Sequence, residues 1–394
     1  MFDKKRLDVL EKSRSNFFTW RGQFTPELVD YILGETAKKN YRLLDPFSGS
    51  GTVLLEAGYM NLECSGIEIN PSAYYMSTFY KFINYQIEER IEFINQLHEK
   101  VFFNINDFYY LPICNKDELD YRKSFINLLN YANMLISSKM SDELLILVVN
   151  LLFKLENLKN CKMGESINNS FNSIKTYLLN LPYSSKKIET YLRDARELSQ
   201  FINTKINLVL TSPPYINVFN YHQNHRMIME LLGYKILNIS EGEIGSNRKN
   251  RGNRLYTVVQ YCLDIEIILN ELMNVLKDNA KLIFIVGRES KVRGLSFYNG
   301  RIVQDLLESI SGVKVLINQE REFSNKFGDR IVEEIIVAEK GKESKYCNSG
   351  RKIALKHLLY KLKKEKLIDE VKSDLKLCID KIETIKSSPI QFVK

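Results

Sequence analysis

The sequence predicts an α/β protein in which short buried strands alternate with helices around a mostly parallel sheet. The first observation is a series of β-type runs separated by helical stretches. The second is that the early runs end in polar, Gly or Pro residues, at the place where open α/β sheets bind their ligands. The predicted strands are residues 41–44, 62–67, 206–210, 280–286, 313–317 and 331–338, with 187–192 as a weaker candidate.

Two stretches depart from this alternation and predict the domain organisation. In residues 82–186, Leu, Ile, Asn and Lys dominate, and apolar residues recur at helical spacing. This stretch is predicted to be a helical insertion that divides the sheet domain into residues 1–81 and 187–339. Residues 340–394 are Lys-rich with the same periodicity, and we expect a basic helical tail.

The composition argues against a membrane protein and against a disulfide scaffold. The longest apolar run, residues 144–153, is much shorter than the roughly 20 residues that span a bilayer. The first residues do not lead into the apolar stretch of a secretory signal. The six cysteines form no C-x-x-C pair, and the four histidines offer no zinc spacing. We therefore expect a cytoplasmic protein with no membrane partner and no metal.

A glycine-rich turn follows the first predicted strand and begins with Asp45. Its two glycines, Gly49 and Gly51, would let the backbone approach a ligand and would expose amides at a helix start. A tight corner alone would also explain them. Glu68 ends the next strand about 20 positions later, where a carboxylate can accept hydrogen bonds from ribose hydroxyls. The pair predicts a nucleoside-binding unit, and the missing Gly-Lys-Ser/Thr ending disfavours a nucleoside triphosphate.

A third strand end carries the sequence Thr211-Ser212-Pro213-Pro214-Tyr215. The two prolines stiffen the backbone and remove amide donors, which leaves the Ser212 hydroxyl and two carbonyls as acceptors. Acceptors beside an aromatic ring suit the exocyclic amine of a flat base. A chain stop is the alternative reading of two prolines at this place.

These segments together resemble the S-adenosylmethionine-dependent DNA methyltransferases that modify exocyclic amines. Residues 45–51 resemble motif I of that family, and residues 211–215 resemble motif IV. Residues 20–26 are similar to motif X, and Glu68 matches the acidic residue of motif II. The resemblance implies a Rossmann-like methyltransferase sheet, here with a helical insertion and a helical C-terminal appendage. It also implies S-adenosylmethionine as the cofactor and double-stranded DNA as the partner.

The resemblance carries site roles onto matching positions. Asp194 matches the acid of motif III, although Arg193 stands where Gly is usual, and Asp107 is the alternative. The implied cofactor-binding residues are Gln23, Phe24, Thr25, Asp45, Phe47, Ser48, Gly49, Ser50, Gly51, Thr52, Glu68 and Asp194. The implied catalytic residues are Ser212, Pro213, Pro214 and Tyr215, with Tyr215 expected to stack on a flipped base.

The first residue of motif IV bears on the target base. Ser212 in that place resembles the cytosine-N4 enzymes, as does the segment 216–222, whereas Asp is usual in adenine-N6 enzymes. A ring-carbon enzyme is disfavoured because it needs a cysteine nucleophile beside the catalytic proline. The alternatives are an adenine-N6 enzyme, an RNA or protein amine methyltransferase, and a catalytically silent DNA-binding protein. His222 and His225 have a spacing that metals use, but without a carboxylate or cysteine partner we expect no metal.

Basic residues mark expected DNA contacts. Four cations lie within seven residues and suit a loop that grips phosphates, although a solvated loop is the alternative: Arg248, Lys249, Arg251 and Arg254. Residues 340–394 carry 15 Lys and Arg against 7 Asp and Glu, so their +8 equals the net charge of the whole chain. We expect removal of this tail to weaken the salt dependence of DNA binding and to leave cofactor affinity unchanged.

Several properties stay open in the sequence. The target-recognition region is residues 81–185, residues 217–256 or the tail. The resemblance implies the modification half of a restriction-modification system and a partner restriction endonuclease. The recognition sequence and the oligomeric state are not predicted.

Overall fold

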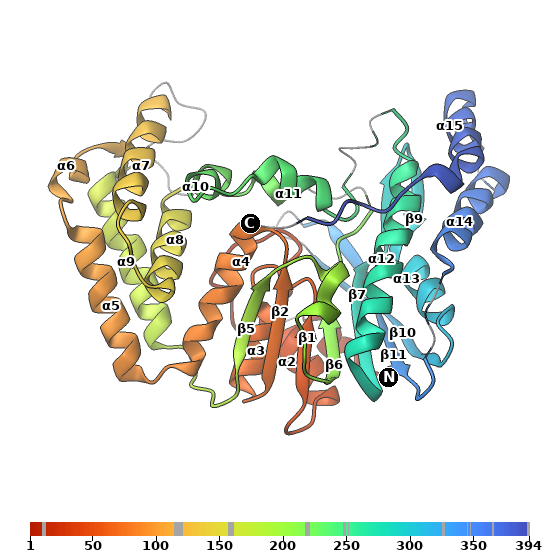
Figure 1. The fold of residues 1–394 in the computed structure, drawn as a ribbon, viewed down its shortest axis with the longest axis horizontal. Helices are drawn as coiled ribbons and strands as arrows, with labels where there is room; N and C mark the ends of the chain where they lie inside the picture. Colours follow the sequence, from red (N-terminus) through yellow and green to blue (C-terminus); the bar gives the residue numbers. More distant parts are fainter. Residues whose placement is uncertain are drawn as a thin grey trace.

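A seven-stranded sheet forms the centre of the computed structural model (Figure 1). The structure describes residues 1–9, 13–113, 121–156, 161–216, 221–246, 250, 252–324, 328–344, 346, 348–364 and 366–391. In spatial order the strands are β10 (Val313–Ser324), β11 (Arg330–Lys340), β7 (Leu276–Gly287), β6 (Ile206–Thr211), β1 (Arg42–Asp45), β2 (Glu63–Glu68) and β5 (Ile188–Leu192). All seven predicted runs are strands of this sheet, including the weaker one.

The strand directions define the fold class. The strands from β7 to β5 run parallel, and β11 is antiparallel to both of its neighbours. Parallel strands joined by helical crossovers, with one antiparallel strand near the edge, make a Rossmann-like methyltransferase sheet. The predicted fold class is therefore confirmed.

Side chains alternate between the two faces of the central strands because successive residues of a strand point to opposite sides. Leu43 of β1 packs in one hydrophobic core, and Leu44 packs in the other. Leu208 and Val209 of β6 divide in the same way. Both faces of these strands are thus buried, which explains why their sequences are continuous apolar runs.

Each face carries its own helices. The first core joins the sheet to α2 (Pro26–Thr36), α3 (Thr52–Tyr59), α4 (Pro71–Thr78) and η1 (Phe79–Asn84). The second core joins it to η2 (Ala195–Gln200), α12 (Tyr256–Val275) and α13 (Asn299–Glu308). Three further elements are α1 (Lys4–Asp8) and the two-stranded sheet of β8 (Glu289–Val292) and β9 (Leu295–Tyr298). Among the described residues, no helix is long and apolar enough to cross a membrane.

The stretch between η1 and β5 is mainly helical and stands beside the β5 edge of the sheet (Figure 1). Its helices are α5 (Ile87–Phe102), α6 (Asn106–Tyr109), α7 (Tyr121–Ile136), α8 (Asp142–Glu156) and α9 (Met163–Leu179). Two very short strands, β3 (Pro112–Ile113) and β4 (Cys161–Lys162), pair within it and were not predicted, because two residues carry no alternation. Buried Asn150 of α8 ties the stretch to α4 by donating to the Tyr75 carbonyl over 2.8 Å.

Short helices lie above the carboxyl ends of the strands. They are η3 (Tyr221–Gln223), α10 (Arg226–Leu231) and α11 (Ile236–Gly242), and they follow β6 in the chain. Figure 1 shows α10 and α11 between the helical stretch and the rest of the molecule, over the upper edge of the sheet.

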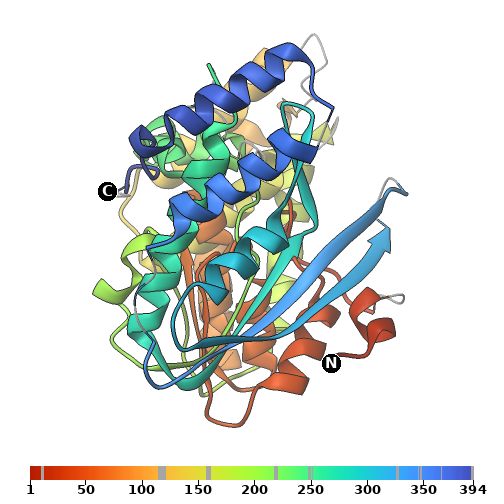
Figure 2. The same ribbon diagram turned by 90° about the vertical axis from the view of Figure 1, so that its right-hand side faces the viewer.

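The Lys-rich tail packs on the body of the protein. Its helices α14 (Gly350–Lys364) and α15 (Asp369–Asp380) are followed by η4 (Ile382–Thr384). Leu358 of α14 and Leu375 of α15 are fully buried in the second core. Both helices are visible in Figure 2, and Figure 1 shows the chain after α15 running back toward the carboxyl ends of the central strands.

Candidate active site

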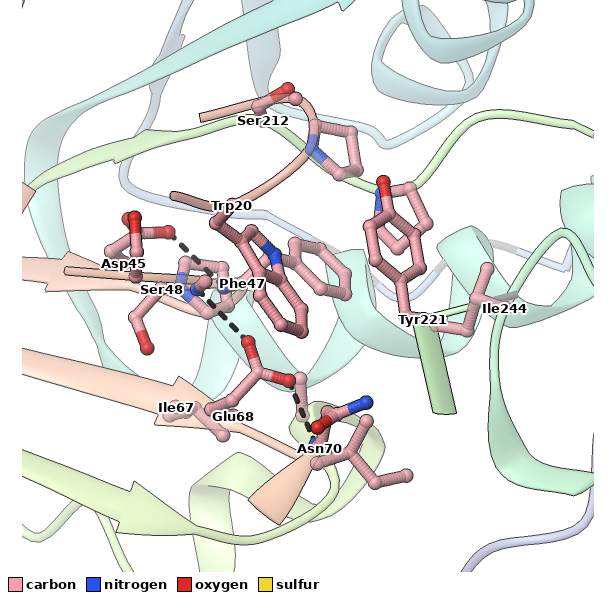
Figure 3. Close-up of a pocket in the computed structure, with 18 of the residues that line it drawn as sticks. Trp20, Asp45, Phe47, Ser48, Ile67, Glu68, Asn70, Ser212, Tyr221 and Ile244 are labelled. Atoms are coloured by element: carbon pink, nitrogen blue, oxygen red, sulfur yellow. Dashed lines mark hydrogen bonds between the residues drawn. The ribbon is translucent and has the colours of Figure 1, made fainter. Parts of the chain in front are cut away.

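A single pocket at the carboxyl ends of β1, β2 and β6 collects most of the predicted site residues (Figure 3). The predicted residues that line it are Gln23, Phe24, Asp45, Phe47, Ser48, Gly49, Ser50, Thr52, Glu68, Asp194, Ser212, Pro213, Pro214 and Tyr215. Segments separated by more than a hundred residues in sequence therefore meet at one place.

Thr25 and Gly51 were predicted to contact the cofactor, but neither lines the pocket. Thr25 is the residue that precedes α2, and its hydroxyl is buried without a hydrogen-bond partner. Gly51 precedes α3 with φ 89°, and a Cβ there would lie 2.8 Å from the Cα of Ser77. Gly51 is thus required for the turn itself and for its close packing.

The turn after β1 is fastened to the end of β2 through Glu68. One carboxylate oxygen of Glu68 accepts from the Gly49 amide over 2.9 Å, and the other accepts from the Asn70 amide over 2.8 Å. Burial raises the pKa of Glu68 to about 7, against the opposing effect of these two amides. Figure 3 shows this carboxylate at the cavity, where it can accept further hydrogen bonds from a ligand.

Asp45 links the turn after β1 to the end of β6, from which residues 212–215 follow. Its carboxylate accepts from the Thr211 hydroxyl over 2.6 Å and from the Phe47 amide over 3.1 Å. Burial raises the pKa of Asp45 to about 7, and both hydrogen bonds oppose that rise. The last residues of β1 and β6 are therefore held side by side.

The loop of residues 212–215 after β6 is supported by a residue that carried no signal in the sequence. The Tyr215 hydroxyl donates to Glu333 Oε1 over 3.5 Å, and the Ser212 hydroxyl lies 3.3 Å from the Tyr215 oxygen. Glu333 also forms an ion pair with Arg321 at 2.7 Å. Because Tyr215 gives its proton to Glu333, Ser212 is the donor in the remaining pair. Glu333 lies on β11, 118 residues after Tyr215, so no local pattern could indicate it.

The ring of Tyr215 lies directly on the backbone of β7. A Cβ added to Gly287 would be 2.8 Å from the Tyr215 ring, so only glycine fits beneath it. Burial raises the pKa of the Tyr215 hydroxyl far above its ordinary value. The predicted stacking of this ring on a base stays a prediction.

The structure separates the two candidates for motif III. Asp194 lines the pocket, whereas Asp107 lies on α6 in the helical stretch and does not line it. The Asp194 carboxylate accepts from Arg196 Nε over 3.0 Å and from Arg196 Nη2 over 2.6 Å. Arg193, in the place of the usual Gly, also lines the pocket.

Two aromatic rings and one acid complete the pocket wall. Trp20 and Tyr221 stack with ring centres 5.6 Å apart, and Figure 3 shows both at the cavity. Glu243 follows α11 and pairs with His222 over 3.0 Å, and its Oε1 is buried without a hydrogen-bond partner. The Ser48 hydroxyl is buried without a partner as well. Residue 243 carried no sequence signal, because it follows a helix and belongs to no motif recognised in the sequence.

These unpartnered atoms and carboxylates fit a nucleoside-type cofactor. Buried polar atoms are normally hydrogen-bonded. The Ser48 hydroxyl and Glu243 Oε1 are therefore the atoms to which a polar ligand could hydrogen-bond. Glu68 and Asp194 add acceptors for hydroxyl or amine groups, and Phe47 and Ile69 add apolar surface.

The expectation that His222 and His225 lack carboxylate partners is wrong. His222 pairs with Glu243, and His225 Nδ1 lies 2.5 Å from Glu156 Oε2 of α8. Each histidine thus has one carboxylate that is remote in sequence. Within the described part of the chain, no group of three His, Cys, Asp or Glu side chains could hold a metal.

Of the four basic residues predicted to bind DNA, only Arg254 lies within the described residues. Arg248, Lys249 and Arg251 lie outside the described residues. Arg254 is exposed just before α12. Phosphate contact by these four residues stays a prediction.

The sheet and its pocket define a Rossmann-like methyltransferase fold. Residues 1–79 match the family model N6_N4_Mtase, described as DNA methylase. Over 264 residues the chain is 23% identical to the Type II methyltransferase M.AvaI of Nostoc sp., a match covering 56% of this chain and 54% of that protein. The chain is also 38% identical over 52 residues to the Type II methyltransferase M.MjaII of Methanocaldococcus jannaschii, covering 13% and 10% of the two chains.

Solved structures are more distant. An S-adenosylmethionine-dependent methyltransferase of Methanosarcina mazei is 11% identical with a TM-score of 0.36, covering 79% of this chain and 98% of that one. TrmN of Thermus thermophilus is 14% identical with a TM-score of 0.32, covering 81% and 50%. The chain spans about half the length of the M.AvaI relative. The sequence matches confirm the resemblance to exocyclic-amine DNA methyltransferases and support S-adenosylmethionine as the cofactor.

Proposed function

We propose that the protein methylates an exocyclic amine of a base in duplex DNA, with S-adenosylmethionine as the cofactor and the N4 of cytosine as the target. The observation that carries the proposal is the junction of β1 and β6. There the Thr211–Asp45 hydrogen bond holds the cofactor turn beside the Ser212-Pro213-Pro214 loop, within one pocket.

The proposed cofactor residues follow from the acceptors of the pocket. Glu68 would bind the ribose hydroxyls, and Asp194 would bind the adenine end. Gln23 and Phe24, which line the pocket from the segment before α2, would cover the methionine end. The cofactor supplies an electrophilic methyl group on a sulfonium, which is a good leaving centre.

The catalytic loop would hold the target amine by its hydrogens. The Tyr215 hydroxyl donates a hydrogen bond to Glu333, and the Ser212 hydroxyl donates one to the Tyr215 oxygen. The lone pairs of the Ser212 oxygen therefore point away from Tyr215. The Ser212 oxygen and the Pro213 carbonyl would then accept the amine hydrogens. This orients the nitrogen lone pair for attack, and positioning of this kind supplies much of the rate in such transfers.

The choice of cytosine N4 rests on Ser212. A serine in this place resembles the cytosine-N4 enzymes, and an aspartate resembles the adenine-N6 enzymes. The adenine-N6 reaction is the second candidate. Identification of the methylated nucleoside in digested DNA separates the two.

The macromolecular substrate is tested by parallel transfer of labelled methyl to duplex DNA, RNA and protein. We expect label in duplex DNA alone. Label in RNA or protein would contradict the proposal, and absence of S-adenosylmethionine binding would favour a silent DNA-binding protein. We also propose a partner restriction endonuclease. We further propose a target-recognition role for residues 82–186, whose helices stand beside the β5 edge of the sheet (Figure 1). A chimera that carries a relative's equivalent stretch would then methylate a different sequence.

A further inference from the structure

The chain after α15 returns to the pocket and ends its described course beside Asp194. We refer to residues 385–391 as the returning segment. Ser388 of this segment is buried, with 3% of its surface exposed. Its amide and hydroxyl donate to the two carboxylate oxygens of Asp264 on α12, over 2.8 and 2.7 Å. The returning segment is therefore anchored in the second core and is not a loose end.

Arg196 connects the returning segment to the pocket. Its side chain is fully buried and forms ion pairs with Asp194 at 2.6 Å and with Asp264 at 3.0 Å. The same guanidinium donates to the Ser388 carbonyl over 2.5 Å and to the Pro389 carbonyl over 3.0 Å. All five N–H groups of a guanidinium can be assigned to these four partners, because Asp194 receives two of them.

The segment also supports the pocket wall at Gly242. A Cβ added to Gly242, which lines the pocket, would lie 2.7 Å from Gln391 Cγ and 3.3 Å from the Pro389 carbonyl oxygen. The backbone amide of Gln391 donates to Asp194 Oδ2 over 3.5 Å. Two lining residues from different elements, Asp194 and Gly242, are thus backed by the same returning segment.

We propose that Arg196 and the returning segment are positioning elements of the cofactor site, which hold Asp194 and Gly242 at the adenine end. This inference rests on the proposed function. Without the segment, buried Arg196 would lose the carbonyls of Ser388 and Pro389 as acceptors and would keep only a 3.4 Å contact to the Gly242 carbonyl in their place. The guanidinium would then pull Asp194 into a different geometry. Removal of the residues beyond 339 should therefore lower cofactor affinity, contrary to the expectation from the sequence.

Truncation tests the proposal with little change in charge. A variant that ends at Lys386 loses only one cation, Lys394, together with most of the returning segment. We expect S-adenosylmethionine to bind it about tenfold or more weakly by calorimetry. DNA affinity without cofactor should stay the same, and kcat at saturating cofactor should change far less than KM. A variant that ends at Gln391 loses the same cation, keeps the segment, and should behave as wild type.

A second variant covers the case in which truncation prevents folding. Gly242→Ala places a methyl group 2.7 Å from Gln391 Cγ and 3.1 Å from Ile69 Cδ1, and the closer contact is the one with the returning segment. It leaves the Arg196 ion pairs intact, so we expect weaker cofactor binding in a folded protein. Gly34→Ala is its control, because nothing lies within 4 Å of that position. Unchanged affinity in the folded variants would overturn the inference alone. Failure of the wild-type protein to bind S-adenosylmethionine would overturn the proposed function and the inference together.

Discussion

The Thr211 hydroxyl donates a 2.6 Å hydrogen bond to the Asp45 carboxylate, and both side chains are buried. Asp45 ends β1 and Thr211 ends β6, which are neighbours in the sheet. This contact joins the turn proposed for the cofactor to the loop proposed for the target amine. A change at either residue should therefore affect both halves of the site.

Thr211→Val keeps the shape of the side chain and removes the donor. We expect a loss of about 1–3 kcal/mol in the free energy of unfolding, because a buried carboxylate loses a hydrogen bond. Urea denaturation measures this loss. Thr176→Val, at an exposed position of α9, is the matched control. Equal stability of the two variants would mean that the Thr211 contact contributes nothing.

The titration of Glu68 should lower the free energy of unfolding of the cofactor-free protein as the pH rises from 4.5 to about 7. Burial raises the pKa of Glu68 from its ordinary 4.5 to about 7. Between those values the folded protein retains a proton that the unfolded chain has lost, so the folded state is favoured at the acidic end. Glu68→Gln cannot titrate and should reduce the slope of stability against pH in denaturation measurements, while Asp45, whose pKa burial also raises to about 7, keeps its own share of that slope. Glu92→Gln, at an exposed position of α5, should leave the profile unchanged, and an unaltered slope in both variants would contradict the account.

Tyr215→Phe should lower kcat about tenfold and leave the affinity for S-adenosylmethionine unchanged. The variant removes the acceptor of the Ser212 proton, so Ser212 can turn that proton toward the target amine. Loss of one such hydrogen bond corresponds to about a factor of ten in rate. Single-turnover kinetics measure the effect.

Glu333→Gln tests the hydrogen-bonded chain Ser212–Tyr215–Glu333 at the member farthest from Ser212. We expect a smaller decrease in kcat, because the amide can still accept from Tyr215 while its ion pair with Arg321 is lost. Tyr183→Phe, at a site 52% exposed, is the control for Tyr215→Phe. A wild-type rate in the Tyr215 variant would show that the hydroxyl has no part in positioning Ser212.

Exposed lysines of the tail should set the salt dependence of DNA binding. The variant with Lys352, Lys363, Lys364 and Lys376 changed to Gln removes four exposed cations of α14 and α15. Each lost phosphate contact reduces the slope of log K against log salt by about one. The change Lys38→Gln with Lys39→Gln lies before β1, at the opposite end of its strand from the pocket, and should not alter the slope. Equal slopes in both variants would mean that the tail does not meet DNA.

The sequence predicted those features that depend on local patterns. The strands followed from apolar runs, of which the first three have polar, Gly or Pro ends, and the turn at Gly49 was predicted to share a site with Glu68, 19 positions later. The direct hydrogen bond between Gly49 and Glu68 was not predicted. Such pairs are brought together by a single strand-helix-strand unit, so their spacing is enough.

The remaining contacts of the site join segments that no spacing rule connects. Arg196 meets Ser388 across 192 positions, and Tyr215 meets Glu333 across 118. The Lys-rich tail was predicted as an appendage because its periodicity shows an apolar face but not what that face covers. Its burial against α12 and the return of the chain to Asp194 depend on tertiary packing alone.

The most direct test of the central claim is the identity of the methylated nucleoside. Duplex DNA treated with the protein and labelled S-adenosylmethionine is digested, and the labelled nucleosides are separated. Ser212→Ala is run in parallel with Ser373→Ala, an exposed position on α15. Cofactor affinity is measured for all proteins by calorimetry.

We expect N4-methylcytosine from the wild-type protein and from Ser373→Ala. In Ser212→Ala we expect turnover to fall by about a hundredfold with cofactor affinity intact, since the serine acts on the target amine and not on the cofactor. N6-methyladenine would contradict the assignment of the base. Methylation of a ring carbon, or transfer at the wild-type rate by Ser212→Ala, would contradict the proposed mechanism.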